Sequence, residues 1–286
     1  MNVLLRFNCM RLNCSQYYKI YLMATQPQQP QQPQQPQQPQ QPQQPCRFIT
    51  FGSHSNYIEA GERLCNQASS LKLFHEMKLY TFADLKSDPE FYDKHSDFIL
   101  KNKRGCGYWL WKPYLIYKNI SEMKNGSILM YLDCGCELDI RKRNKIIELI
   151  HLVKQHKVIT SYRQFESKWT KMDLLVALNA VNSQQLLQTP QKEAGAIIML
   201  VCDETRKLVR QWYQVATSNN YHFIDDSPSV KPNIPSFNEH RHDQSIFSLL
   251  VKQHGLCNWI NICDYVVYDR NKTGKSQLYK KSLCFV

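Results

Sequence analysis

A Gln-Pro repeat occupies residues 26–45 and sets the first limit on how this chain folds. Proline recurs at every third position, and each proline fixes φ and lacks a backbone N–H donor. Helix and sheet are therefore excluded there, and the repeat holds no side chain suited to a core. We expect a disordered polyproline-type linker, about 60 Å long when extended at roughly 3.1 Å per residue. A ligand for an aromatic groove is the alternative, but no Lys or Arg lies within the repeat to orient such docking.

Residues 1–25 precede the repeat and contain no targeting signal that fits. Arg6, Arg11 and Lys19 interrupt every apolar stretch, so neither a secretory signal nor a membrane span is expected. Met23 offers an alternative start just before the repeat. We expect residues 1–25 to be disordered or untranslated, and residues 1–22 to be dispensable.

Residues 46–286 remain to build the fold, and about 240 residues is a normal size for one α/β domain. The chain has 11 cysteines, an odd number without the paired spacing of a disulfide framework. Because no signal peptide is expected, we interpret them as reduced thiols in a cytoplasmic protein.

The net charge of +12 is concentrated in two clusters, within residues 141–145 and 272–281. Such surfaces attract polyanions, which include nucleic acids, acidic membranes and phosphorylated ligands. No recognised nucleic-acid-binding motif accompanies these clusters, so we expect no specific nucleic-acid partner.

Strand and helix patterns alternate through the rest of the chain. The expected strands are 46–51, 78–82, 127–132, 158–161 and 196–201, and the expected helices begin near 57, 89, 112, 142, 204 and 243. Asn56 and Asp88 are expected to cap two of these helices, and Pro89 suits a first helical position. Within the strand expected at 127–132, residues 128–132 are apolar throughout, as in a central strand buried on both faces. The alternation favours an α/β fold with helices on both faces of a sheet.

An acid, Asp133, follows this central strand directly, and Gly135 and Glu137 come next. Ligands of open α/β sheets bind beyond the carboxyl ends of strands. A carboxylate delivered there is costly unless it has a partner, and a divalent cation that also touches a diphosphate is one such partner. Gly135 would let a bulky ligand approach the backbone. A plain turn is the alternative role for Asp133.

Residues 104–114 combine two glycines and four aromatic side chains with the cations Arg104 and Lys112. Backbone amides and these two cations suit a phosphate cradle. The Gly-x-Gly alone is a weak signal because the third glycine of the dinucleotide-binding motif is missing. Trp109 and Tyr114 could equally be core residues.

A third polar cluster, residues 239–245, contains His240, Arg241, His242 and Asp243. Histidine can ligate a metal or hydrogen-bond a sugar hydroxyl, and an acid beside it can act as a base. Asp243 also stands where a helix is expected to begin, so an N-cap is the alternative. Two histidines, an arginine and an acid in four residues are more than a cap requires.

Five motifs in this order resemble a family of GT-A glycosyltransferases found in large DNA viruses and in bacterial surface-polysaccharide clusters. They are Arg-Gly-x-Gly-Tyr-Trp-x-Trp-Lys-Pro-Tyr at 104–114, Tyr-Leu-Asp-x-Gly-Cys-Glu at 131–137, Thr-Lys-x-Asp at 170–173, Gln-x-x-Ala-Gly at 191–195 and His-Arg-His-Asp-Gln-Ser at 240–245. No single motif is specific, but together they are. The resemblance covers roughly residues 46–268.

The resemblance implies a GT-A-like mixed sheet flanked by helices. By this likeness, residues 46–139 form a nucleotide-sugar half, residues 140–268 form an acceptor half, and residues 269–286 form a basic tail. The implied reaction moves a sugar from a nucleoside-diphosphate sugar to an acceptor hydroxyl on a glycan, a protein or a small molecule, in the synthesis of a glycan or surface polysaccharide.

Site residues follow by the same likeness. Asp133 stands at the place of the metal-binding Asp-x-Asp motif, but the third position is Gly135, so Glu137 or His240 would have to complete a Mn²⁺ or Mg²⁺ site. Asp243 is the candidate catalytic residue. The implied donor-binding residues are Arg104, Gly107, Trp111, Lys112, Gly135, Gln191 and His242.

Two other functions remain open at this point. A non-catalytic relative that binds a sugar or nucleotide-sugar is the first, because the second motif acid is missing. A nucleic-acid-binding protein is the second, because of the positive charge.

Overall fold

The computed structural model describes residues 45–268 and 270–278 of the chain. The predictions for residues 1–25, and those for the repeat before Pro45, lie outside these residues. The division into a linker, two halves and a tail stays a prediction.

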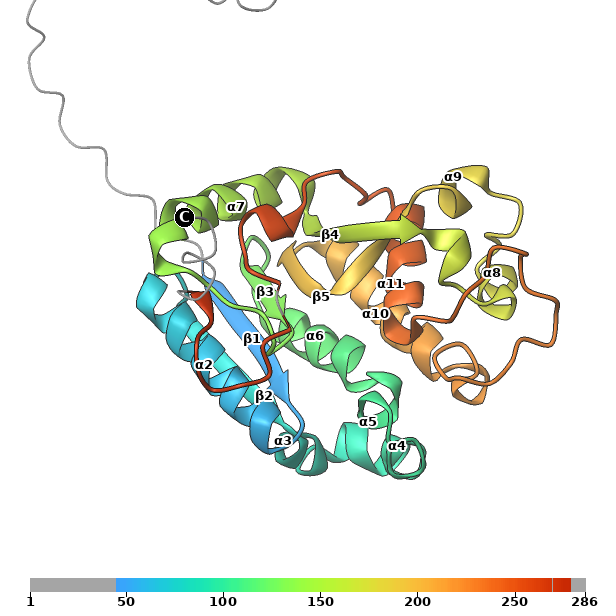
Figure 1. Cartoon of the computed structure of the whole chain (residues 1–286), viewed down its shortest axis with the longest axis horizontal. Helices are drawn as coiled ribbons and strands as arrows, with labels where there is room; N and C mark the ends of the chain where they lie inside the picture. The colour runs from blue at the N-terminus through green and yellow to red at the C-terminus, as the bar shows by residue number, and fades with distance from the viewer. Residues whose placement is uncertain (1–44, 269, 279–286) are drawn as a thin grey trace, which may run out of the picture. The chain divides into compact units, whose positions relative to one another are not determined.

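A mixed five-stranded sheet lies at the centre of the described residues, in the order β2-β1-β3-β5-β4 (Figure 1). The strands are β1 (Cys46–Gly52), β2 (Glu76–Thr81), β3 (Ile128–Leu132), β4 (Val158–Phe165) and β5 (Pro190–Leu200). Strand β1 is parallel to both β2 and β3, whereas β5 is antiparallel to both β3 and β4.

Helices cover both faces of this sheet (Figure 1). The α-helices are α2 (Ser55–Leu71), α3 (Phe82–Lys86), α4 (Pro89–Lys101), α5 (Gly105–Tyr108), α6 (Trp111–Glu122), α7 (Arg143–His156), α8 (Met172–Ala177), α9 (Gln184–Leu187), α10 (Asp203–Thr217) and α11 (His242–Gln253). Short 3₁₀ turns lie at Ile140–Lys142, Glu166–Lys168, Asn219–Tyr221 and Ile262–Asp264. Helices α2 and α7 pack on one face, and α6, α10 and α11 pack on the other. The prediction of an α/β mixed sheet flanked by helices is confirmed.

Strand β3 separates two cores, which is why its sequence is apolar at every position. Met130 belongs to the core under α2 and α7, and Leu129 and Tyr131 belong to the core under α6 and α11. All five residues of the strand are buried. A strand buried on both faces carries no polar alternation, and its next residue is the first that can reach water. That residue is Asp133.

The largest error in the strand predictions concerns β5, which begins at Pro190 and not near residue 196. Its first part carries Gln191, Lys192 and Glu193, which are polar but buried. Partners distant in sequence bind this part of the strand; for example, the Gln191 side-chain amide donates to the Ser245 hydroxyl at 3.3 Å, and the Lys192 backbone amide donates to the Ser248 hydroxyl at 2.8 Å. The polar residues at 191–193 therefore did not suggest a buried strand, because their hydrogen-bond partners are distant in the sequence.

One predicted cap, Asn56, is wrong, and the other, Asp88, takes the N-cap position without a capping hydrogen bond. Helix α2 begins at Ser55 after His54, which leaves Asn56 inside its first turn. Asp88 does precede α4, with Pro89 at the first helical position as predicted, but it makes no capping hydrogen bond. The carboxylate of Asp88 instead accepts from the Tyr114 hydroxyl at 2.7 Å and from the Lys118 ammonium at 2.5 Å.

All cysteines within the described residues are free, as the sequence predicts for reduced thiols. No helix within these residues is long and apolar enough to cross a membrane.

Candidate functional site

A cavity of about 550 Å³ opens at the edge of the sheet where the parallel strands β1 and β3 both end. Its walls come from segments that are far apart in sequence: residues 51–57, 103–112, 133–136 and 241–244, together with Gly195, Tyr268, Arg270 and Lys272. This is the strand edge at which the sequence predicts a ligand site.

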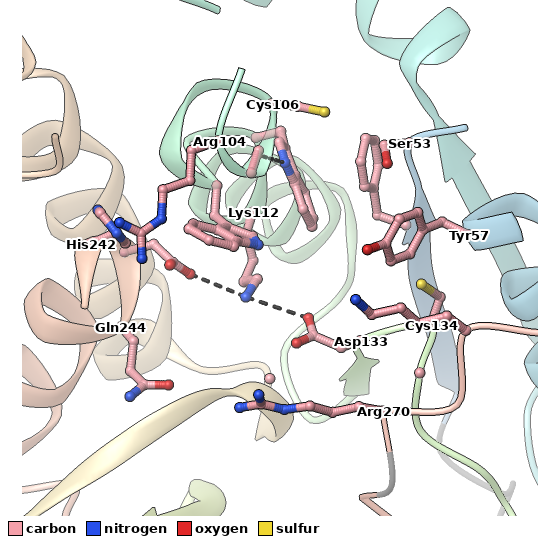
Figure 2. A pocket seen from close by; sticks show the side chains of 18 of the residues that line it. Ser53, Tyr57, Arg104, Cys106, Lys112, Asp133, Cys134, His242, Gln244 and Arg270 are labelled. Carbon is pink, nitrogen blue, oxygen red and sulfur yellow. Dashed lines mark hydrogen bonds and ion pairs between the residues drawn. The ribbon is translucent and has the colours of Figure 1, made fainter. Parts of the chain in front are cut away.

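The ammonium group of Lys112 lies between two carboxylates in this cavity (Figure 2). Its Nζ is 3.4 Å from Oδ1 of Asp133 and 3.2 Å from Oδ2 of Asp243. Lys112 comes from the start of α6, Asp243 from the first turn of α11, and Asp133 from the residue after β3. The side chains of Lys112 and Asp243 are 4% and 5% exposed, whereas that of Asp133 is 37% exposed. Asp133 is thus the carboxylate that a ligand meets first.

The electrostatics of this group follow from its burial. Desolvation raises the pKa of Asp243 to about 6, against the lowering effect of the Lys112 ammonium and with a further rise from Asp133. Burial would lower the pKa of Lys112, but the two carboxylates outweigh it and raise that pKa. Lys112 therefore stays charged at neutral pH, and Asp243 exchanges a proton close to neutrality.

Tyr131 fixes the orientation of the exposed acid. Its hydroxyl donates to Oδ1 of Asp133 at 2.5 Å. Burial, with the Asp133 charge adding to it, raises the pKa of Tyr131 well above its ordinary value, so the phenol remains a donor. The backbone amide of Asp133 also donates to the Gly195 carbonyl at 2.7 Å. Asp133 is held by β3 and β5 before any ligand arrives.

The cavity is strongly basic. Only two acids, Asp133 and Asp243, belong to its lining. The lining also includes six Lys or Arg residues: Lys103, Arg104, Lys112, Arg241, Arg270 and Lys272. Two of these cations have acidic partners of their own. Arg104 pairs with Asp226 at 3.1 Å, and Arg241 pairs with Glu239 at 2.8 Å. The remaining positive charge suits a ligand with several negative charges.

Aromatic rings form another part of the wall. Trp111 stacks on Phe51 with ring centroids 3.9 Å apart, and its indole N–H donates to the Gly105 carbonyl at 3.0 Å. Trp109 is partly exposed and lies beside the His242 ring, with centroids 5.3 Å apart. Tyr57 faces the cavity from the first turns of α2 (Figure 2). Such rings provide flat surfaces on which a base or a sugar can stack.

Seven of the predicted site residues line this cavity: Arg104, Trp111, Lys112, Asp133, Gly135, His242 and Asp243. The other four, Gly107, Gln191, Glu137 and His240, are absent from its lining. The functional roles assigned to all of these residues stay predictions, but the structure changes the physical interpretation of several.

Glu137 and His240 do not join Asp133 in a cation site, which corrects the expectation that one of them completes it. The Glu137 carboxylate is fully buried, where it accepts from the Ser276 hydroxyl at 2.5 Å and the Gln277 amide at 2.9 Å. Nε2 of His240 hydrogen-bonds the Phe223 carbonyl at 2.9 Å. Neither residue lines the cavity.

Gly107 and Gln191 are enclosed by other parts of the protein and lie outside the cavity lining. Gly107 has φ +84°, and a Cβ there would lie 2.8 Å from Cγ1 of Ile99, so both its conformation and its packing require glycine. Gln191 lies inside the protein, where its amide donates to Glu166 at 2.9 Å. Neither residue reaches the cavity lining.

Gly135 lines the cavity, but the backbone of Arg270 and Asn271 packs directly against it. A Cβ at Gly135 would lie 2.9 Å from Cα of Arg270, and the Asn271 amide donates to the Gly135 carbonyl at 2.8 Å. We expected Gly135 to make room for a ligand. In the structure, the absence of a side chain at this position instead allows two segments of the chain to pack closely.

Asp243 is not the helix cap that the sequence leaves as an alternative. Arg241 occupies the N-cap position of α11 and makes no side-chain capping bond, and Asp243 lies in the first helical turn. The backbone carbonyl of Asp243 accepts from the Trp212 indole at 2.8 Å, which fixes the residue in the core. Its carboxylate pairs with the Lys112 ammonium.

This site could hold a metal ion only with a single protein carboxylate among its ligands. Within residues 45–268 and 270–278, no group of three or more His, Cys, Asp or Glu side chains stands together as a metal site. Asp133 could supply one carboxylate, and the remaining ligands would be water and phosphate oxygens. Mg²⁺ is often held in this way, by one or two carboxylates together with a substrate's phosphates.

Several lining residues were not predicted from the sequence, chiefly Tyr57, Gln244, Tyr268, Arg270 and Lys272. Lys272 was noted only as part of a charge cluster, and Arg270 not at all. Gln244 belongs to the motif at 240–245 but received no role, and the segment around Tyr268 carries no signal of its own. Only the folding of the last part of the chain against residues 133–137 brings Tyr268, Arg270 and Lys272 to the site.

No family model and no curated protein matches the sequence. Among solved structures, mouse xyloside xylosyltransferase 1 in its apo form is similar, with 10% sequence identity, 76% of this chain and 85% of that chain covered, and a TM-score of 0.42. A glycosyltransferase involved in the glycosylation of the major capsid of PBCV-1 is also similar, with 10% identity, 68% and 81% covered, and a TM-score of 0.30. Overlaps this low carry no argument about activity, which has to come from the site itself.

Proposed function

We propose that this chain is a glycosyltransferase that moves a sugar from a nucleoside-diphosphate sugar to an acceptor hydroxyl. One observation carries the proposal. At the carboxyl ends of two parallel strands, the cavity brings together the partly exposed Asp133, the buried Asp243 with a pKa of about 6, and an excess of cations. The resemblance of the five sequence motifs to GT-A glycosyltransferases supports the same reaction.

The donor's chemistry matches the two kinds of wall. A diphosphate carries charge that Arg104 and the other lining cations would neutralise. The rings of Tyr57, Trp109 and Trp111 suit the flat faces of a base or a sugar. The departing diphosphate gains negative charge during transfer, so fixed cations near it would lower the barrier.

Asp243 is our candidate for the acid–base step. During transfer the bond between the anomeric carbon and the phosphate oxygen breaks, and the acceptor oxygen forms a new bond to that carbon. The acceptor hydroxyl loses its proton, which the Asp243 carboxylate would take. A pKa of about 6 leaves this group ionised at neutral pH but still basic enough to accept a proton. Lys112 would hold the carboxylate in place.

A divalent cation remains part of the proposal in the form that the residues allow. Asp133 would contribute the protein ligand to Mn²⁺ or Mg²⁺, and the donor's phosphates would contribute others. When bound, the ion would offset charge on the leaving diphosphate.

Thermal unfolding with a panel of nucleoside diphosphates and their sugars, with and without Mn²⁺, tests the donor. A ligand at a hundred times its Kd adds about 2.7 kcal/mol of stability, which gives a clear rise in Tm. We expect one nucleotide class to produce this rise. Absence of stabilisation by every nucleotide and nucleotide-sugar would refute the proposal.

Hydrolysis of the selected donor without an acceptor then tests catalysis. We expect slow release of the nucleoside diphosphate by the wild-type protein. Binding without any hydrolysis, and without transfer to any acceptor in a sugar panel, would instead identify a non-catalytic nucleotide-sugar-binding protein.

A further inference from the structure

We propose that the C-terminal segment (residues 270–278) completes the donor site, with Arg270 and Lys272 binding the donor's diphosphate and Glu137 holding the segment in place. The inference rests on the proposed function, because it names further residues for the same ligand. It also changes the roles expected from sequence: Glu137 becomes a positioning residue and not a metal ligand, and the start of the basic tail becomes part of the site.

Glu137 is the main anchor of the C-terminal segment. Its side chain is fully buried and accepts hydrogen bonds from three residues of that segment. The donors are the Ser276 hydroxyl at 2.5 Å, the Asn271 side-chain amide at 2.8 Å and the Gln277 backbone amide at 2.9 Å. A buried carboxylate that gathers three donors from one short segment fixes that segment's position.

Arg63 extends this anchor to the loop that carries Asp133. Nη1 of Arg63 lies 3.7 Å from Oε1 of Glu137, and both side chains are almost completely buried. Nη2 of Arg63 donates to the carbonyls of Cys134 and Cys136, at 2.8 and 2.9 Å, and to that of Asn271 at 3.3 Å. One guanidinium therefore ties α2, the loop 133–137 and the C-terminal segment together.

Backbone packing brings the segment still closer to the site. The Asn271 amide donates to the Gly135 carbonyl at 2.8 Å. At Gly135, any Cβ would lie 2.9 Å from Cα of Arg270, a distance that real Cβ contacts do not reach. Glycine at position 135 thus permits the segment to cross directly beside Asp133.

The segment presents two cations to the cavity. Arg270 and Lys272 are exposed and line the same cavity as Asp133, and Figure 2 shows Arg270 reaching toward it. Nζ of Lys272 lies 5.3 Å from the ring centroid of Tyr57, on the cavity wall formed by α2. Within residues 45–268 and 270–278, no carboxylate forms an ion pair with either side chain. Their charge is therefore available to a ligand.

A diphosphate fits this arrangement better than a single carboxylate would. Arg104 comes from another segment of the cavity wall, and Figure 2 shows it and Arg270 around the same cavity as Asp133. A ligand with two linked phosphates can meet cations on both sides, with Asp133 left for the bridging ion of the proposed function. Guanidinium groups bind phosphate oxygens in pairs, which adds orientation to charge.

Calorimetric titration of the full chain with inorganic pyrophosphate, and with the nucleoside diphosphate selected by the panel, tests the two cations. We expect R270A/K272A to weaken both affinities at least tenfold, about 1.4 kcal/mol. The charge-preserving R270K/K272R variant should recover most of the affinity. Lys275→Ala is the matched control, because Lys275 is an exposed lysine of the same segment outside the cavity lining. It should stay within twofold of wild type.

The positioning role of Glu137 has its own readout. Trypsin cleaves after Arg270, Lys272 and Lys275, and we expect the segment to resist cleavage in the wild type and more strongly with pyrophosphate. Glu137→Gln should expose these bonds and lower pyrophosphate affinity as far as R270A/K272A does. Should Glu137→Gln fail to fold, Asn271→Ala removes one of the segment's contacts while the Arg63 pair stays, and it should show the same two changes more weakly.

The outcomes separate the two proposals. If the wild type binds neither pyrophosphate nor any nucleoside diphosphate, the proposed function and this inference both fail. If the wild type binds and R270A/K272A binds as tightly as Lys275→Ala, the C-terminal segment is not part of the donor site, and the proposed function stands. Unchanged affinity in Glu137→Gln with a cleaved segment would also refute the positioning role.

Discussion

Replacing Lys112 by methionine isolates the electrostatics at the centre of the cavity. Met keeps most of the apolar stem of the side chain and removes the ammonium that lies 3.2 Å from Asp243 and 3.4 Å from Asp133. Asp243 is fully buried, so it must either remain charged without its partner or take up a proton.

Protonation of Asp243 limits the loss of stability caused by Lys112→Met. In the wild type the pKa of Asp243 is raised from 3.8 to about 6, and without Lys112 it must rise further because a lowering cause is gone. Above pH 6 the folded variant then binds a proton that the folded wild type has lost, while the two unfolded chains bind equally. Stability of the variant therefore falls relative to wild type as pH rises, by about 1.4 kcal/mol per pH unit. Between pH 6 and pH 8 this adds about 2 kcal/mol, because the wild-type carboxyl is only half ionised at pH 6.

At pH 5 the same change should cost little through Asp243. That carboxyl is then mostly protonated in the folded wild type as well, so removal of Lys112 does not alter its charge. The loss that remains comes from Asp133, whose side chain is 37% exposed and partly screened by water. We expect about 1 kcal/mol or less from that pair.

Urea unfolding of wild type and Lys112→Met at pH 5, 6, 7 and 8 measures this difference. Lys118→Met is the matched control on the same helix, because Lys118 pairs with Asp88 at 2.5 Å but its side chain is 40% exposed. Burial would raise the pKa of Asp88, but Lys118 and Tyr114 outweigh it and hold that pKa below its usual value, so Asp88 is ionised throughout this range in the wild type. The control should cost about 1 kcal/mol or less at every pH. A Lys112→Met cost that is equal at pH 5 and pH 8 would refute the reasoning.

Three further predictions concern activity and domain structure. Asp133→Asn should abolish transfer and weaken Mn²⁺ binding while the chain stays folded, whereas the exposed Asp203→Asn should leave transfer unchanged; full activity of Asp133→Asn in a transfer assay would exclude the cation role. Asp243→Asn should lower turnover by roughly a hundredfold with donor affinity kept, and the wild-type kcat/KM should fall as pH drops through about 6, where Asp243 takes up its proton; a pH profile that Asp243→Asn leaves unaltered would contradict the base assignment. Deletion of residues 1–44 should leave Tm almost unchanged, since the repeat holds nothing that a core could bury, and a large drop in scanning calorimetry would show that the boundary is wrong.

Local pattern was sufficient for much of the fold. The apolar run 128–132 predicts a strand buried on both faces, because only such a strand lacks polar alternation, and β3 occupies that range with two cores beside it. The same reasoning predicts that Asp133 emerges at a strand end. Strand β5 escaped prediction over its first half, because Gln191 and Lys192 are buried polar residues whose partners are distant in sequence.

The sequence by itself thus determined the mixed α/β pattern of elements and the arrival of Asp133 at the edge of the sheet, since both depend on residues within one turn or strand of each other. Tertiary structure decided the rest of the site. Lys112 lies between Asp133 and Asp243 only because α6, β3 and α11 converge there. Glu137 looks like a ligand in sequence but turns inward to Asn271, 134 residues away. A hydrogen-bond partner at that separation leaves no periodic or local trace, because the energy of a buried charge depends on which groups the fold places beside it.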